Sequence, residues 1–423
     1  MGNFTPEAAR ALPGPSWLVE RRVGAAERFA SAVFPSSAEE AWRYSRIEDL
    51  DLDRFRPGSG ADGDGPASWT PAAEIPGGAG RIVCVNGRVV EARLDESLEA
   101  KGVVLADLAA HPEAAEWLGR CSDTSPDPFI HLHDAFLVGG AFIRVPDGVV
   151  VEGPIVVEHL SQGDGLATFP HLVLAAGRDS EVSVLERFSS PPAGGPHLTV
   201  PVTELVVGDA ARVNYLGMQF HGRTVWQVGL QRALLGRDST LRASAVALGG
   251  DYARLRAEAF LAGPGASSEM VAVYFANEAQ MLDFRTLQDH DAHHTTSDLL
   301  FKGAVEDTAS SVYSGLVRLR KPAQRANAAQ TNRNLVLSPG AAAKSIPNLE
   351  IEANDVRCSH ASAVGPIDDD QLYYLQSRGV PPEVAERLIV FGFFEDVIAR
   401  LPIVGLTDTL RAAVAGKFEA RRG

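Results

Sequence analysis

The sequence predicts a mainly β protein, with a right-handed parallel β-helix (a solenoid) as its core and helical domains at both ends. Short β-rich runs such as "VVVEGPIVVEHL" and "VWQVGLQRALLG" follow one another from residue 140 to residue 365 with almost no helical periodicity. Similar turn segments recur, as "GRDSEV" at 177, "GDAARV" at 208, "GRDSTL" at 236 and "GPGASS" at 263. A repeat of roughly 20–50 residues that lacks helices indicates stacked coils. A large β-sandwich is the alternative, because the register of the repeats is irregular.

We expect the chain to divide into four segments. Residues 1–80 form an N-terminal helical domain that ends in a Gly/Pro-rich linker, and residues 81–140 form a mixed α/β lead-in. Residues 141–366 form the β-helix core, and residues 367–423 form a C-terminal helical domain.

Local patterns support the first two segments. Apolar residues recur at near-helical spacing in "SWLVERRVGAAERFASAVF", and "PSSAEEAWRYS" is typical of the start of a second short helix. Residues 57–80 are rich in Gly, Pro and Asp, as in a linker or a mobile loop. Asn86-Gly87 within "RIVCVNGRVV" is a strong type I′ hairpin signal, and a helix is predicted around residues 103–118.

The C-terminal segment predicts three helices. "DDDQLYYLQSRG" has an acidic first turn, "PPEVAERLIVFGFFEDVIARL" begins with Pro and has a wide apolar face, and "TDTLRAAVAGKFEARRG" ends with basic residues. Three helices are too few to bury their own apolar surface. They must therefore pack against the solenoid end or against another protein. Phe391, Phe393 and Phe394 are therefore candidates for docking a partner, and packing on the solenoid is the alternative for each.

Charge and composition exclude several classes of function. The net charge of −15 over 423 residues argues against sequence-independent nucleic-acid binding and against docking on an anionic membrane. No run approaches the roughly 18 apolar residues of a membrane span, and the N-terminus lacks the pattern of a signal peptide, so we expect a cytoplasmic protein. No GxxxxGK[ST] motif occurs, so we do not expect the chain to hydrolyse nucleotide itself. The GxSxG motif of a serine nucleophile is also absent from the sequence.

The three cysteines suggest at most half of a metal site. Cys84 and Cys121 have no suitably spaced partners and are interpreted as small buried residues. Cys358 and His360 are two residues apart, which would place a thiol and an imidazole on the same side of a strand. Their position just before the helical tail predicts the last coil of the solenoid, whose unpaired edges a partner chain could cover while supplying the missing ligands.

A second group of metal-binding side chains lies in "LQDHDAHHTTSDLLFKG". His290, His293 and His294 could bind zinc or iron, and a self-contained metalloenzyme is the hypothesis that follows. We favour the simpler interpretation, in which these residues form a polar face and turn of one coil and are hydrogen-bonded by neighbouring coils.

Long stretches of the last third of the chain resemble a known family. They include "HHTTSDLLFKG", "SSVYSGLVRL" and "LEIEANDVRCSHASAVGPIDDDQLYYLQSRG", and they are similar to the SufB/SufD family of iron–sulfur cluster assembly scaffolds. Within it the chain resembles the SufD-type member, because it is short and has no cysteine between Cys121 and Cys358.

The resemblance implies partners and a cargo. It implies a non-catalytic scaffold that pairs with a SufB-type paralogue through the solenoid end and with a SufC-type ATP-binding-cassette ATPase through the C-terminal helices. The implied cofactor is a transient iron–sulfur cluster shared with the partner, with none tightly bound to the isolated chain. A homodimer and a purely architectural subunit remain alternatives.

The resemblance also assigns the two residues of the C-x-H motif. His360 aligns with the family's histidine and Cys358 with its cysteine, both facing the paralogue. His360 is the expected iron ligand, and Cys358 could be a second ligand if a neighbouring His or Arg lowers its pKa. The glycine that usually follows in the family is Ala361 here, which should be tolerated unless the backbone requires a positive φ.

Overall fold

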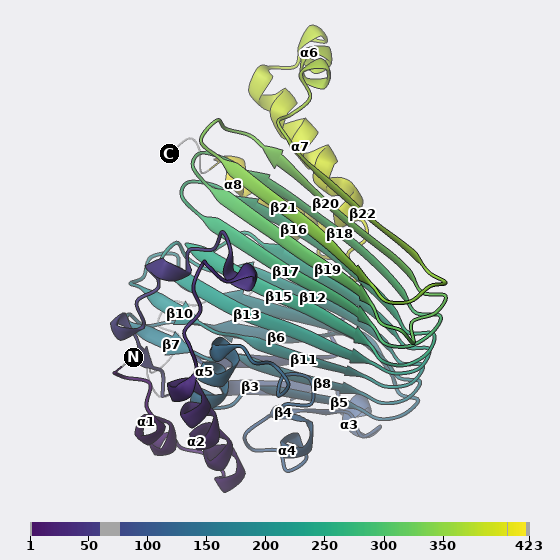
Figure 1. Cartoon of the computed structure of the whole chain (residues 1–423). Helices are drawn as coiled ribbons and strands as arrows, with labels where there is room; N and C mark the ends of the chain where they lie inside the picture. Colours follow the sequence, from purple (N-terminus) through teal and green to yellow (C-terminus); the bar gives the residue numbers. More distant parts are fainter. Residues whose placement is uncertain (1, 60–76, 404, 420–423) are drawn as a thin grey trace.

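The computed structural model describes residues 2–59, 77–403 and 405–419. Within these residues, strands wind between two large sheets as a parallel β-solenoid, and helices lie at both ends of the chain (Figure 1). Through most of the solenoid, consecutive strands alternate between the two sheets, so each strand pairs with the strand two positions along the chain. The predicted solenoid is therefore confirmed and the β-sandwich is excluded.

The first sheet contains twelve of the described strands, and its strand pairs are parallel except for β4 with β5. In spatial order, its main path is β21 (Ala342–Ile351), β19 (Ser310–Leu319), β17 (Met281–His290), β15 (Tyr252–Leu261), β13 (Val225–Leu235), β11 (Val202–Val207), β8 (His171–Ala176), β5 (Ala141–Val145) and β4 (Val104–Asp107), with β1 (Arg56–Pro57), β7 (Leu166–Thr168) and β10 (His197–Thr199) beside it.

The second sheet contains ten of the described strands, and its strand pairs are parallel except for the hairpin of β2 with β3. In spatial order it runs β22 (Arg357–Gly365), β20 (Asn327–Val336), β18 (Thr296–Val305), β16 (Ser267–Ala276), β14 (Thr240–Ala247), β12 (Arg212–Phe220), β9 (Glu181–Ser189), β6 (Val150–Leu160), β2 (Gly80–Val85) and β3 (Arg88–Leu94). Asn86 and Gly87, both with positive φ, form the predicted turn of the hairpin.

The recurring turn segments connect the two sheets and stack on one another. One residue in each adopts a positive φ, namely Asp179 at 55°, Ala210 at 57°, Asp238 at 52° and Gly265 at 75°. The backbone N–H of each of these residues donates to a carbonyl of the next turn, as Asp179 does to Asp209 at 2.8 Å. This stacking explains why similar turn sequences recur at the spacing of one coil.

Side chains alternate along each strand between the lumen of the solenoid and its outer surface. Leu282 and Phe284 of β17, for example, point into the lumen, where small and aromatic residues from both sheets form one continuous hydrophobic core. Tyr252 of β15 and Met281 of β17 belong to a different cluster on the outer face of the twelve-stranded sheet. The lumen is thus a packed interior, and each outer face can carry additional elements.

The N-terminal helices cover the outer face of the twelve-stranded sheet, where α1 (Pro6–Ala11), α2 (Ser16–Ser31) and α5 (Pro128–Phe136) pack together. The predicted second helix at "PSSAEEAWRYS" is wrong, since only a 3-10 turn, η1 (Glu40–Trp42), forms there, followed by η2 (Ile47–Asp49) and η3 (Leu52–Arg54). Trp42 is held by Arg254, whose guanidinium lies 3.9 Å from the centre of the ring and pairs with Asp283 at 2.6 Å. Tertiary contacts therefore replace helical periodicity in this region.

Two further expectations in the N-terminal third need correction. The helix predicted around residues 103–118 is wrong, because Val104 to Asp107 form strand β4, which pairs with β5, and only α4 (Ala114–Trp117) is helical; α3 (Glu96–Glu99) precedes them. The linker predicted at residues 57–80 is wrong at both of its described ends, because Pro57 pairs with β7 and Gly80 begins β2. Residues 60–76 of that segment lie outside the described residues.

The C-terminal helices are α6 (Asp369–Ser377), α7 (Pro382–Ile398) and α8 (Thr407–Glu419). Helices α7 and α8 pack on the outer face of the ten-stranded sheet, not on the solenoid end, because Phe394 and Val414 share one hydrophobic cluster with residues of that sheet. Helix α6 extends beyond the last coil (Figure 1) and has no buried residue. Among the described helices, none has both the length and the apolar character needed to cross a membrane.

Candidate half-site at the open end of the solenoid

The solenoid ends in two edge strands, and one of them carries the predicted C-x-H motif. Among the described strands, β22 has a ladder only with β20 in its sheet, and β21 has one only with β19. Each therefore has one side with an unpaired row of backbone N–H and C=O groups. The motif lies at the start of β22, as the sequence predicts for a last coil.

Cys358 and His360 continue a row of side chains that fills the lumen in the coils below. In the ladder, Cys358 is opposite Ala328 and His360 is opposite Gln330, and both of these β20 residues are buried. No described coil covers β22, so Cys358 is half-buried and His360 is exposed. The thiol and the imidazole therefore project on the same side of one strand at the open end of the lumen.

The surroundings of Cys358 are apolar. It packs against a small hydrophobic cluster that includes Val317, Ala328 and Leu349 from neighbouring strands. Burial raises the pKa of its thiol above the ordinary value, and no charged neighbour offsets that effect among the described residues. The expectation that a nearby His or Arg would lower this pKa is therefore not met, and Cys358 is a protonated thiol at neutral pH.

The second histidine group does not converge on one point. His290 is buried in the lumen, where its Nδ1 lies 2.8 Å from the Thr295 hydroxyl and its Nε2 lies 2.9 Å from the Ser297 hydroxyl. Burial lowers the pKa of His290 to about 4. His293 and His294 are exposed in the following turn. In the part of the chain that the structure describes, no three His, Cys, Asp or Glu side chains form a group suited to a metal ion.

The three predicted docking phenylalanines differ in exposure. Phe394 is completely buried against the ten-stranded sheet, whereas Phe391 and Phe393 are partly buried at the edge of the same cluster. Lys302 of β18 fixes this helix further, since its Nζ donates to the carbonyl of Phe393 at 2.8 Å and to Asp396 at 2.7 Å. Phe394 thus holds α7 on the solenoid and is not available on the surface of this chain.

The exposed apolar surface of the C-terminal helices lies instead on α6 and α7. Tyr373 is 73% exposed and Tyr374 is 58% exposed. A shallow groove of about 430 Å³ beside Tyr374 is lined by Asp370, Gln371, Leu375 and Ile389. No role was predicted for these tyrosines from the sequence, although the "LYYL" pattern places two aromatic rings next to each other on a short helix.

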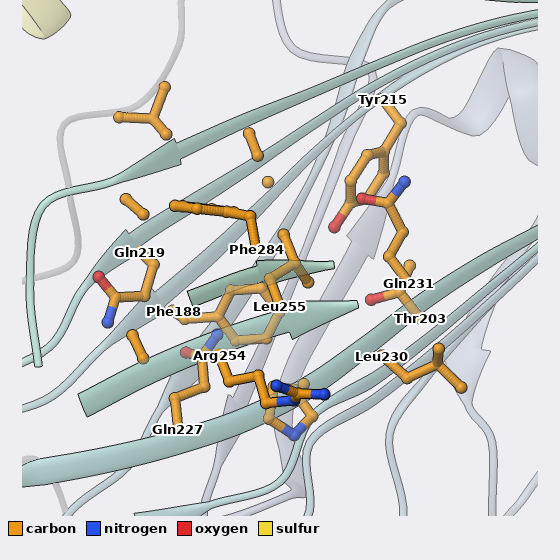
Figure 2. Close-up of a pocket in the computed structure, with 17 residues that line it drawn as sticks. Phe188, Thr203, Tyr215, Gln219, Gln227, Leu230, Gln231, Arg254, Leu255 and Phe284 are labelled. Carbon is orange, nitrogen blue, oxygen red and sulfur yellow. The ribbon is translucent and has the colours of Figure 1, made fainter. Parts of the chain in front are cut away.

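A second hollow lies deep inside the solenoid, away from the open end. This lumen cavity has a volume of about 40 Å³. Its lining includes the polar side chains of Thr203, Gln219 and Gln227 together with Phe188 and Phe284 (Figure 2). Such a volume suits a few water molecules.

Aromatic side chains fill the lumen between that cavity and the last coil. Phe284, Phe301 and Tyr313 follow one another in contact, with ring centroids 5.7 Å apart for the first pair and 5.4 Å apart for the second. The open end is therefore a site separate from the cavity.

Comparison with known proteins identifies a matching family. The family model described as "SUF system FeS cluster assembly, SufBD core domain" matches residues 159–393. An iron–sulfur cluster assembly SufBD family protein of Mycobacterium tuberculosis is 36% identical over 282 residues, which cover 65% of this chain and 68% of that protein.

Two relatives named SufD match over longer stretches. The iron–sulfur cluster assembly protein SufD of Bacillus subtilis is 31% identical, covering 77% of this chain and 76% of the relative. SufD of Escherichia coli is 27% identical, covering 91% of this chain and 89% of the relative.

These matches show that the chain belongs to the SufB/SufD family of iron–sulfur cluster assembly proteins. The solenoid and the C-x-H motif on its last strand are consistent with that family. Within that family it is a SufD-type member.

Proposed function

We propose that this chain is a non-catalytic scaffold subunit, and that a nascent iron–sulfur cluster forms where its open solenoid end meets a SufB-type paralogue. The observation that carries the proposal is the exposed lumen row of β22, which presents His360 beside Cys358 on an edge strand. Among the described residues this end offers two suitable ligands, so we take it as half of a cluster site for which the paralogue supplies the rest.

The edge strands support pairing with another solenoid. Ile351 on β21 is 47% exposed and Val364 on β22 is 44% exposed, so the uncovered end combines free backbone hydrogen-bonding groups with apolar side chains. Addition of a partner strand would satisfy both. A second copy of this chain could use the same edges, and a homodimer is therefore an alternative outcome that sedimentation would detect.

The chemistry of the two side chains suits a transient cargo. His360 is exposed, and an imidazole nitrogen is a competent iron ligand. Cys358 must lose its proton before it can bind iron, and burial opposes that loss in the free chain. We therefore expect the isolated chain to hold no cluster tightly and the assembled complex to hold one.

The α6–α7 surface is the proposed docking site for a SufC-type ATPase. Its exposed Tyr373 and Tyr374 and the adjoining groove offer the aromatic anchors that protein interfaces favour. The sequence carries no Walker A motif, so ATP hydrolysis would take place in that partner.

The test is an anaerobic co-purification with the paralogue and the ATPase through a tag on this chain. Iron, acid-labile sulfide and the visible spectrum are recorded for the wild type and for His360→Ala. His293→Ala is the matched control, because His293 is also exposed but lies in a turn between β17 and β18. We expect a labile cluster in the wild type and the control, and an intact complex without the cluster in His360→Ala.

Other results would change the assignment. An unchanged cluster in the His360→Ala complex would favour a purely architectural subunit. Stoichiometric metal on the lone chain, unaffected by His360→Ala, would favour a self-contained metalloenzyme instead.

A further inference from the structure

One buried amide lies directly beneath the proposed half-site. Gln330 of β20 is 1% exposed and is the ladder partner of His360 on β22. Neighbouring strands are about 4.8 Å apart, so the two side chains occupy the same lumen row in successive coils. Within the described part of the chain, neither the oxygen nor the nitrogen of the Gln330 side-chain amide has a hydrogen-bond partner.

The other polar residues farther along β20 are satisfied. Asn332 donates to the Tyr274 hydroxyl at 3.0 Å and to the carbonyl of Phe301 at 3.1 Å, and Asn334 donates to Asn332 at 2.7 Å. Native proteins rarely leave a buried amide unsatisfied, and those that do usually complete it with water or a ligand. Gln330 differs from these two residues because its amide has no partner among the described residues and because it lies opposite His360.

The amide packs closely against a glycine of the opposite sheet. Gly315 of β19 lies across from it, and a Cβ added there would come within 2.6 Å of the Gln330 Nε2 and 2.3 Å of the Tyr313 hydroxyl. Ser345 of β21, the ladder partner of Tyr313, also has a buried hydroxyl without a partner among the described residues. Buried polar atoms without a partner among the described residues therefore occur on both sheets near the open end.

We propose that Gln330 positions the cluster at the half-site. The amide of Gln330 donates a hydrogen bond to an anionic sulfur atom of the cluster, and His360 ligates the iron of the same cluster. The inference rests on the proposed function, and it adds a residue that binds cargo through hydrogen bonding without being an iron ligand. An amide buried in the lumen is held rigidly, and little water is present to compete for its hydrogen bonds. Its N–H groups are therefore strong donors toward a sulfide or thiolate. Hydrogen bonds to cluster sulfurs tune the reduction potential, and such outer-shell partners also affect retention of the metal.

The test compares Gln330→Met with Gln288→Met in the complex with the paralogue and the ATPase. Gln288 of β17 is the matched control, because it too is fully buried with an amide that has no partner among the described residues, but it lies on the other sheet. Met preserves length and removes the amide in both variants. Gln330→Asn, which keeps a shorter amide, is the conservative variant.

We expect Gln330→Met to bind the cluster with a more negative reduction potential and to lose iron to a chelator about ten-fold faster than the wild type. Gln288→Met should match the wild type in both measurements, and Gln330→Asn should recover part of the loss. Melting temperatures of the isolated chains show whether either variant is misfolded, and removal of an unsatisfied amide should leave both folded.

Two results would overturn the inference. A reduction potential and an iron-loss rate in Gln330→Met equal to those in Gln288→Met, while His360→Ala abolishes the cluster, would refute the role of Gln330 alone. Retention of the cluster in His360→Ala would refute the proposed function, and the inference would fail with it.

Discussion

Cys358 offers the most direct chemical test of the half-site in the isolated chain. Cys84 and Cys121 are buried and Cys358 is only half-buried, so it should be the one thiol that native protein exposes to a small alkylating reagent. An ordinary cysteine with a pKa of about 8.5 is about 3% thiolate at pH 7. Because burial raises the pKa of Cys358, its thiolate fraction must be lower, and its alkylation slower than that of free cysteine.

The assay is iodoacetamide labelling of the native chain between pH 6.5 and pH 10, with the modified residue identified by mass spectrometry. We expect one modified thiol, a rate at pH 7 below that of free cysteine, and a rate that is still rising at pH 9. Cys358→Ser should abolish native labelling, while all three wild-type thiols react in denaturant. A labelling rate that reaches its plateau below pH 8 would refute the burial argument, because Cys358 would then be an activated thiolate.

Two further predictions concern the docking of the C-terminal helices. Phe394→Ala removes a fully buried ring from the α7 interface and should lower the free energy of docking by about 3–5 kcal/mol, seen as loss of amide-exchange protection in α7 and α8. The exposed Tyr373→Ala should lower it by less than about 0.5 kcal/mol. Equal effects of the two substitutions would contradict the packing described. The Lys417 ammonium is buried against Asn277 and Gln280, and desolvation, reinforced by Arg223, lowers its pKa to about 7 from 10.5. The pKa of Lys417 is lower in the folded chain than in the unfolded chain, so undocking of α8 takes up a proton between about pH 7 and pH 10.5. Docking of α8 should therefore become more favourable by about 2–3 kcal/mol from pH 6 to pH 9. Urea denaturation of the wild type and of Lys417→Met should show this difference, and identical pH profiles would count against it.

The sequence was sufficient for the core of the fold because local signals repeat there. The turns at Asp179, Ala210 and Asp238 share a positive φ and hydrogen-bond to one another, so their similarity in sequence reflects stacking in space. The C-x-H motif could be placed on a last coil because β patterning ends just after it. Those features depend only on neighbouring residues and on the period of the coil.

Other features depend on contacts that no local pattern records. The helix predicted around residues 103–118 fails because β4 is drawn into the sheet by β5, far away in the sequence. The apolar pattern of α7 indicates burial but not its location, which Phe394 reveals only in the folded chain. Likewise, the relation of Gln330 to His360 follows from the register between strands, which the irregular repeat does not determine.

Amide hydrogen exchange at the open end tests most directly whether the solenoid end is an interface completed by a partner. Exchange is followed in β21 and β22 for the isolated chain, confirmed as a monomer by sedimentation, and again after addition of the SufB-type paralogue. We expect rapid exchange at the unpaired edges of both strands in the free chain and strong protection in the complex, with β15 in the middle of its sheet unchanged. Unaltered exchange in β21 and β22 within a stable complex would show that the partner binds elsewhere and would contradict the shared cluster site.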